Sequence, residues 1–308
     1  MATVFVVGLA LAGDEFLDAQ ELGTVLRRVE VSFLPLLLLL PLIYLWLKSV
    51  RYVDLFSFSG PPLTSAFQRH QVMHSYGSAQ SATLLPGGYV ARIGLVQATT
   101  KLGARAVIPT LLEKGIDLLV LALIGLGTSS IFPQTQKYVA PLGILLALTF
   151  TASASPRVRG WFGTASSWIL GKLCRKKLVQ EALSFHRPTG PVLAALSVQT
   201  AAVLCLEFLL LWVSFAALGL QVNPLLLVIA YCASDIIGRL APTPGGVGFT
   251  ELGMVTLISS FSLLGLEQAA AAVFLFRAAL FLLPAFYGAC CYTRLRFDES
   301  QTSDALKR

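Results

Sequence analysis

The sequence predicts an all-α integral membrane protein, a polytopic helical bundle of about 6–8 transmembrane helices. Three observations support this fold class. The 308 residues are 56% hydrophobic and only 13% charged, and the mean hydropathy is +0.75. Soluble domains carry about 25% charged residues. Several apolar runs also approach the length of about 20 residues that a helix needs to cross a bilayer, and such runs exclude the alternating pattern of an outer-membrane barrel.

The first 30 residues are predicted to lie at the membrane interface, ahead of a transmembrane domain at 31–292. Residues 1–13 are apolar but too short to span easily, and they lack the basic segment that opens a cleaved signal peptide. Residues 14–30 are net acidic. We therefore expect a surface segment at 1–30.

Residues 31–50 form the first predicted span. Pro35 and Pro41 inside it indicate a kink. Lys48 and Arg51 stand at its end. Because positive residues gather on the cytoplasmic side of a membrane, these two residues are interpreted as marking a cytoplasmic end.

Residues 61–85 are long enough to cross the membrane but unusually polar. A helix facing lipid cannot carry so many polar groups, so this segment is expected inside the bundle or beside a water-filled cavity. His70 and His74 have the i, i+4 spacing of metal ligands, but no third ligand is near in the sequence. We interpret them as hydrogen-bonded or interfacial histidines and predict no metal site and no cofactor.

Later spans are predicted at residues 106–127, 137–151, 191–220, 224–240, 249–264 and 267–292. Basic residues dominate the loop at 156–190, where Glu181 alone opposes them: Arg157, Arg159, Lys172, Arg175, Lys176, Lys177 and Arg187. This bias predicts that the loop and the tail at 293–308 are cytoplasmic, in a multi-pass protein of the cell (inner, plasma) membrane. The loop is either a plain positive-inside loop or an interfacial helix on anionic headgroups.

The stretch 240–251, LAPTPGGVGFTE, separates two of these spans with two prolines and three glycines. Proline removes a backbone donor and glycine is a poor helix former, so a broken or re-entrant helix is expected. A helix that restarts near Val247 would turn its free N–H groups toward the break, where they suit a phosphate or carboxylate.

A second glycine-rich turn, LLPGGYVAR at 84–92, resembles the first. Pro86-Gly87-Gly88 aligns with Pro244-Gly245-Gly246, which makes a weak internal repeat. The basic residues after it indicate that the region 61–105 enters and returns on the same side of the membrane. Paired interruptions in two halves point to a transporter's binding site. The alternative is that both are loop turns between ordinary spans.

Ionisable residues inside the predicted spans are costly, so each needs a partner or a function. They are Glu113, Lys114, Asp117, Glu207, Asp235, Arg239, Glu251 and Arg277. Glu113 and Asp117 are four residues apart and share a helix face. Arg277 lies in mid-span, and Glu251 is its first expected partner, with Asp235 second. These groups either lock helices together as ion pairs or line a polar cavity, where the acids would hold a cationic group or a proton.

Two motifs resemble signatures of the lysylphosphatidylglycerol synthase transmembrane (flippase-like) family. PTPGGVGFTE, followed by an apolar stretch and FRAAL, resembles the C-terminal signature. PGGYVARIGLVQATTKLGARAVIPTLLEKGIDLLVL resembles the earlier one, although its turn lacks the usual glutamate and Lys114 stands where the family often has arginine. By this resemblance Arg92 matches the turn arginine.

The resemblance also implies a function and a set of site residues. Members of the family move aminoacylated phosphatidylglycerol between leaflets, and others sit beside glycosyltransferases that use polyprenyl phosphate. By resemblance, the expected headgroup-binding residues are Arg92, Gly245, Gly246, Glu251 and Arg277, and the paired turn adds Gly87 and Gly88. The expected cavity acids are Glu113 and Asp117, by resemblance, and Asp235, from its position inside a span.

We therefore expect a lipid flippase or transporter that moves a phosphate-containing lipid between leaflets. Its partners would be membrane lipids with anionic headgroups, without nucleic acid, and a homo-oligomer stays open. The first alternative is an enzyme, or the membrane subunit of one, acting on a lipid-linked substrate. The second is a scaffold for a partner synthase or glycosyltransferase. No catalytic triad, metal motif or soluble catalytic domain is recognisable in the sequence, which favours the transporter over the enzyme.

Overall fold

The computed structural model describes residues 19–58, 66–80, 107–131, 190–240, 246 and 248–306, and within them the chain is helical with no strand. The first glycine-rich turn with Gly87, Gly88 and Arg92, and Gly245 of the second, lie outside the described residues. So do residues 1–13, the predicted span at 137–151 and the basic loop at 156–189.

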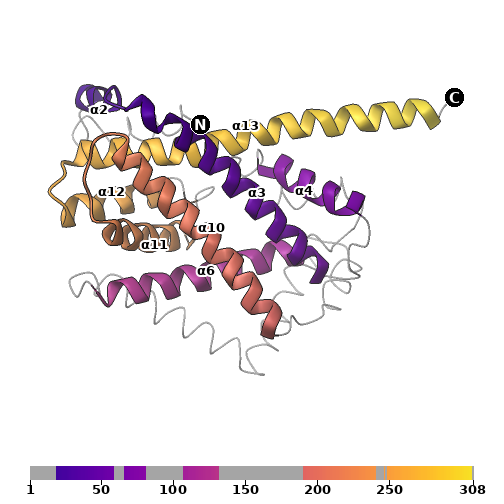
Figure 1. Ribbon diagram of the computed structural model, residues 1–308, viewed down its shortest axis with the longest axis horizontal. Helices are drawn as coiled ribbons and strands as arrows, with labels where there is room; N and C mark the ends of the chain where they lie inside the picture. The colour runs from indigo at the N-terminus through magenta and orange to yellow at the C-terminus, as the bar shows by residue number, and fades with distance from the viewer. Residues whose placement is uncertain are drawn as a thin grey trace.

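The helices follow the order of the predicted spans. They are α2 Ala19–Leu26, the short 3-10 helix η1 Val31–Phe33, α3 Leu34–Phe58, α4 Ala66–Gln80, α6 Val107–Ser129, α10 Gly190–Ala216, α11 Pro224–Leu240, α12 Phe249–Phe261 and α13 Leu266–Leu306. Helices α3 and α10 cross the bundle in contact with each other, and α13 packs against both (Figure 1). Leucine, valine and alanine side chains fill the core between them.

Three helices of the described part are long and apolar enough to cross a membrane. The candidate spans are Val31–Phe56, Ala194–Ala216 and Leu266–Cys290. Their outer faces still expose large apolar side chains such as Trp46 and Phe286, as expected of surfaces that lipid covers. The predicted fold class, a polytopic helical membrane protein, is confirmed.

Helix α3 corrects the interpretation of its two basic residues. The helix continues past residue 50 to Phe58, and the side chains of Lys48 and Arg51 are only 8% and 1% exposed. Tyr44, Lys48 and Arg51 recur at i, i+4 and i+7, so they share one helix face, and that face turns into the protein. The two residues are therefore interior groups and do not mark the end of a span. Pro41 lies inside the helix, as predicted.

Helices α11 and α12 form an antiparallel hairpin whose tip is the glycine-rich stretch. Gly238 lies against Thr250, and Ser234 lies against Gly253. Farther from the tip, Ile229 and Leu257 belong to one apolar cluster. The sum of the paired residue numbers stays nearly constant along the hairpin, which is the mark of antiparallel helices.

The hairpin confirms the predicted break and shows how short its arms are. Helix α11 ends at Leu240 and α12 begins at Phe249, two residues after the predicted restart. At 1.5 Å per residue, the 17 residues of α11 span about 26 Å and the 13 residues of α12 about 20 Å. Both are shorter than the hydrocarbon core of about 30 Å, although each arm was predicted as a full span.

Small residues let the two arms of the hairpin touch. A Cβ on Gly238 would lie 1.9 Å from the Thr250 Oγ1, and one on Gly253 would lie 2.7 Å from the Ser234 Oγ. Gly246 has a φ of 70°, and a Cβ there would lie 2.7 Å from the carbonyl oxygen of Gly238. Glycine is therefore required at the tip for both backbone conformation and space.

The remaining helices close the bundle. Helix α4 packs on α3 and α13; it buries Val72, Ser75 and Tyr76 and leaves His70 exposed. The predicted polar segment is therefore interior on one face only. Helix α2 packs on α13, which fits a surface segment. The last helix runs without a break through residue 306, into the predicted tail, and its C-terminal part projects from the bundle (Figure 1).

Candidate functional site

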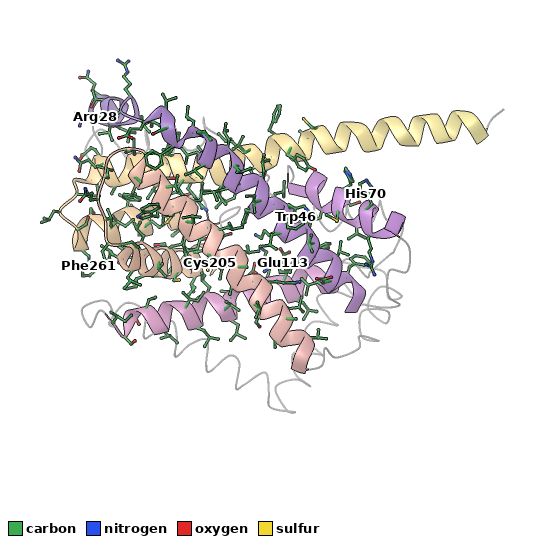
Figure 2. The ribbon with its side chains drawn as sticks, in the orientation of Figure 1. Arg28, Trp46, His70, Glu113, Cys205 and Phe261 are labelled. Atoms are coloured by element: carbon green, nitrogen blue, oxygen red, sulfur yellow. The ribbon has the colours of Figure 1, made fainter. Side chains whose placement is uncertain are left out.

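The interior of the bundle contains an arginine that joins three helices. Arg51 on α3 donates from Nη1 to Asp117 Oδ1 on α6 at 2.6 Å and to Thr200 Oγ1 on α10 at 2.7 Å. Its Nη2 donates to Glu113 Oε1 on α6 at 3.1 Å. Figure 2 labels Glu113 in the interior of the bundle, with α3, α6 and α10 around it. Hydrogen bonds between charged groups are about twice as strong as neutral ones, so this arginine fixes the spacing of the three helices.

A fourth helix reaches the same centre through a tyrosine. Tyr76 on α4 donates its hydroxyl to Glu113 Oε1 at 2.8 Å. The ring of Tyr76 stacks on that of Tyr52 with centroids 4.7 Å apart, and the Tyr52 hydroxyl lies 3.1 Å from Thr110 Oγ1. The hydrogen bond from Tyr76 to Glu113 therefore explains part of the polar character of α4 that the sequence shows.

Asp117 extends the centre to the glycine-rich hairpin. Its Oδ2 lies 3.5 Å from Arg239 Nη1 on α11 and 3.9 Å from Lys114 Nζ. Arg239 also donates from Nε to Asp235 Oδ2 at 2.6 Å. We call this set, Arg51, Glu113, Lys114, Asp117, Asp235 and Arg239, the Arg51 network. Its three cations balance its three acids, so it adds no net charge to the interior.

A separate ion pair holds the tip of the hairpin against α13. Arg277 Nε donates to Glu251 Oε1 at 2.5 Å, which confirms the first expected partner of this arginine. Asp235, the second, pairs with Arg239 instead. The other oxygen of Glu251 accepts the Gly248 N–H at 2.7 Å. The start of α12 is therefore capped by the chain's own carboxylate, so this N–H is not free for a ligand as the sequence had suggested.

Two buried arginines have donors without a hydrogen-bond partner among the described residues. These donors are Arg51 Nε and Arg277 Nη2. The guanidinium carbon of Arg277 lies over the ring of Phe281, 4.5 Å from its centroid. Because buried polar groups are nearly always hydrogen-bonded, each of these donors calls for a water molecule or a ligand.

The structure brings together most of the expected residues that it describes. Glu113, Asp117 and Asp235 lie in the Arg51 network, and Glu251 and Arg277 form the tip pair. Gly246 is buried against Gly238, where it serves close packing. Among the described residues, no group of three or more His, Cys, Asp or Glu could hold a metal ion, and the rings of His70 and His74 lie edge to face at 4.2 Å.

Sequence reasoning missed Arg51, Tyr76 and Thr200. The signal for Arg51 was present, since Tyr44, Lys48 and Arg51 form a polar stripe at helical spacing in an otherwise apolar helix. The two acids on α6 also required a cation. Thr200 carried no such signal, because a single threonine in an apolar helix commonly bonds its own backbone, as this one also does to Leu196.

Comparison with protein families gives one match that covers nearly the whole chain. The family model described as the lysylphosphatidylglycerol synthase TM region matches residues 1–288. No curated protein and no solved structure matches the chain. The family match and the apolar helices together indicate a membrane-embedded protein of lipid metabolism or transport.

Proposed function

The chain belongs to the family of lysylphosphatidylglycerol synthase transmembrane regions, and we propose that it moves a phosphate-bearing lipid between the two leaflets of a membrane. The lipid would be of the aminoacyl-phosphatidylglycerol or polyprenyl-phosphate type. The observation that carries this proposal is the unpartnered Nη2 of Arg277, buried beside the tip of the hairpin of α11 and α12.

Arg277 suits a phosphate because of the shape of its side chain. A guanidinium offers donors in a rigid fork, and here only Nε is engaged, by Glu251. The free Nη2 can donate to a phosphate oxygen while the pair with Glu251 stays intact. In a site shielded from water such a charged hydrogen bond is strong, so one donor can hold a headgroup whose tails remain among the lipids.

The acids of the Arg51 network suit a cationic headgroup. Asp117 binds Arg51 closely, but Arg239 and Lys114 approach its other oxygen only to 3.5 and 3.9 Å. These are its weakest contacts by distance. The ammonium group of an aminoacylated lipid could take the place of Arg239 or Lys114 beside this oxygen with little loss of interaction energy. Arg239 would keep Asp235 as its partner.

Transport also requires a part that moves. The hairpin is a compact unit whose arms touch along their length. Among the described residues, Arg239 and Asp117 form a charged contact between the hairpin and α6. Release of that link by a headgroup would let the hairpin tilt against α6, and such motion of one part against another is how broken-helix transporters alternate access.

The test is a headgroup-accessibility assay in proteoliposomes. Labelled phosphatidylglycerol, its lysyl ester and a polyprenyl phosphate are compared for leaflet exchange. The informative variant is Arg277→Lys, because an ammonium can still pair with Glu251 but lacks the second donor of the fork. We expect at least a tenfold loss of exchange, roughly the effect of 1.4 kcal/mol.

Two further variants separate binding from folding. Arg28→Ala removes an exposed arginine near α2 and serves as the matched control, with exchange unchanged (Figure 2). The pair Glu251→Gln with Arg277→Gln removes both charges together, so neither is left buried alone. Exchange at the normal rate in folded Arg277→Lys would refute the role of Nη2, and no exchange of any lipid by folded wild type would refute transport.

A further inference from the structure

Among the residues that the structure describes, one buried acid lacks an arginine partner. The buried carboxylates of this part are Glu113, Asp117, Glu207, Asp235 and Glu251. Four of them form ion pairs with Arg51, Arg239 or Arg277. Glu207 on α10 is 3% exposed, and among the described residues no cation lies within 4.0 Å of it.

Glu207 is held by tyrosines instead. The hydroxyl of Tyr231 on α11 donates to Glu207 Oε2 at 2.5 Å. The ring of Tyr231 is fixed edge to face between Phe208 and Phe276, with centroids 5.3 and 5.9 Å away. From α3, the hydroxyl of Tyr44 also faces Glu207. The acid therefore lies where α3, α10 and α11 meet.

A buried lysine completes the chain of polar groups. Lys48 on α3 donates from Nζ to the Tyr44 hydroxyl at 2.7 Å, and it lies 4.7 Å from the ring centroid of the same tyrosine. No carboxylate of the described residues lies within 4.0 Å of this ammonium. Lys48 and Tyr44 thus form one hydrogen-bonded pair, and Tyr231 and Glu207 a second that faces it. We call these four residues the Glu207 chain.

We propose that Glu207 is a proton-binding site, loaded through Tyr44 from Lys48. A hydroxyl both donates and accepts, so Tyr44 can pass a proton on. One N–H bond of Lys48 breaks as its proton goes to the Tyr44 oxygen, and the Tyr44 O–H bond breaks as its proton goes to Glu207. The neutral Lys48 amine then takes a proton from water, so the net change is the uptake of one proton.

The surroundings leave Glu207 as the acid most suited to this change. Among the described residues Glu207 has no cation within 4.0 Å, so protonating it breaks no ion pair. The titratable or charged groups that face the chain are Tyr76 on α4, Glu113, Lys114 and Asp117 on α6, Cys232, Asp235 and Arg239 on α11, and Arg277 on α13. The acids in that group are neutralised by their own arginines, so protonating them would break ion pairs.

Proton binding at Glu207 could couple the proposed lipid transport to a proton gradient. This part of the inference rests on the proposed function. Glu207 and Tyr231 join α10 to α11, an arm of the hairpin. A protonated Glu207 accepts the Tyr231 hydrogen bond less strongly, because the bond is no longer charge-assisted. Proton binding would then loosen the hairpin from α10, and proton release would tighten it.

The direct test is infrared difference spectroscopy of the full chain in lipid nanodiscs during a pH titration. A protonated carboxyl has a C=O band of its own, separate from the amide bands. We expect a band that grows on acidification and is lost in Glu207→Gln. In Tyr231→Phe the band should persist at a shifted frequency, since its hydrogen bond is gone. The matched control is Glu267→Gln, which removes a partly exposed acid at the start of α13 and should leave the band unchanged.

The outcomes separate this inference from the transport proposal. A band that persists in Glu207→Gln, or no titrating carboxyl band in the wild type, would overturn the proton site. If the band behaves as expected but no lipid exchanges in proteoliposomes, the site stands and transport fails. In the transport assay, an imposed pH gradient should speed exchange several-fold in the wild type, and this response should vanish in Glu207→Gln.

Discussion

Arg51 and Asp117 meet in the interior of the bundle, with 2.6 Å between Nη1 and Oδ1, although 66 residues separate them in the sequence. They are 1% and 3% exposed. A charge at such a position is stable only with its partner, because transfer from water costs several kcal/mol for each ion. Arg51, Asp117 and Glu113 are therefore the part of the network that holds the fold together. The longer contacts of Asp117 with Arg239 and Lys114 are free to change.

Replacing Arg51 alone should destabilise the fold strongly. Arg51→Met removes the cation that Glu113 and Asp117 share, and breaking a buried pair in this way costs about 3–5 kcal/mol. The measurement is thermal unfolding in detergent, followed by intrinsic fluorescence. The triple variant with Glu113→Gln and Asp117→Asn should recover most of the loss. A melting temperature of Arg51→Met equal to that of the wild type would contradict the burial of this charge.

The contact between Arg239 and Asp117 should be much weaker than that between Arg51 and Asp117. The atoms are 3.5 Å apart, and Arg239 is 16% exposed in its side chain. A double-mutant cycle of Arg239→Gln and Asp117→Asn isolates the coupling energy. We expect about 1 kcal/mol or less, because the contact is long and Arg239 keeps part of its solvation. A coupling of about 3 kcal/mol or more, the cost expected for Arg51→Met, would mean that the hairpin is locked to α6 and cannot serve as the moving part.

Much of the fold could be predicted because strong local signals agree with it. Residues 191–220, 224–240 and 249–264 were predicted as helices, and α10, α11 and α12 occupy nearly those ranges. Apolar runs of that length form helices in a membrane because the backbone must satisfy its own hydrogen bonds. The pair of Glu251 and Arg277 was predictable for a similar reason, since an arginine in mid-span requires an acid nearby.

The parts that could not be predicted depend on tertiary contacts. The charge bias predicts that Arg51 marks the cytoplasmic end of a span, because basic residues that follow an apolar run normally lie on the cytoplasmic side. Only the acids of α6, 62 and 66 residues away, turn it into an interior group. The hairpin length depends likewise on where α11 meets α12, through Gly238 and Gly253. No local pattern encodes which glycine meets which side chain.

Gly238→Ala should disrupt the hairpin. The new Cβ would lie 1.9 Å from the Thr250 Oγ1 and 3.4 Å from the Gly246 Cα, so the arms must separate near the tip. Overpacking of this kind costs about 1–3 kcal/mol. Gly127→Ala in α6 is the matched control, since nothing lies within 4 Å of its Cβ. The same unfolding assay should show a loss only for Gly238→Ala. The double variant Gly238→Ala with Thr250→Ala should regain part of it, and the absence of any recovery would show that the clash is not with Thr250.

Thr250→Val should stabilise the protein, which is unusual for a buried substitution. The Thr250 side chain is 1% exposed and its Oγ1 has no hydrogen-bond partner among the described residues, so the folded state bears the desolvation cost of that hydroxyl. An unsatisfied buried group costs about 1–3 kcal/mol, and a methyl group of similar shape removes that cost. The melting temperature should therefore rise. The same substitution at Thr256, which is exposed on the same helix, should leave it unchanged. A fall in stability of Thr250→Val would mean that the hydroxyl is hydrogen-bonded in the folded protein, and the prediction would then be wrong.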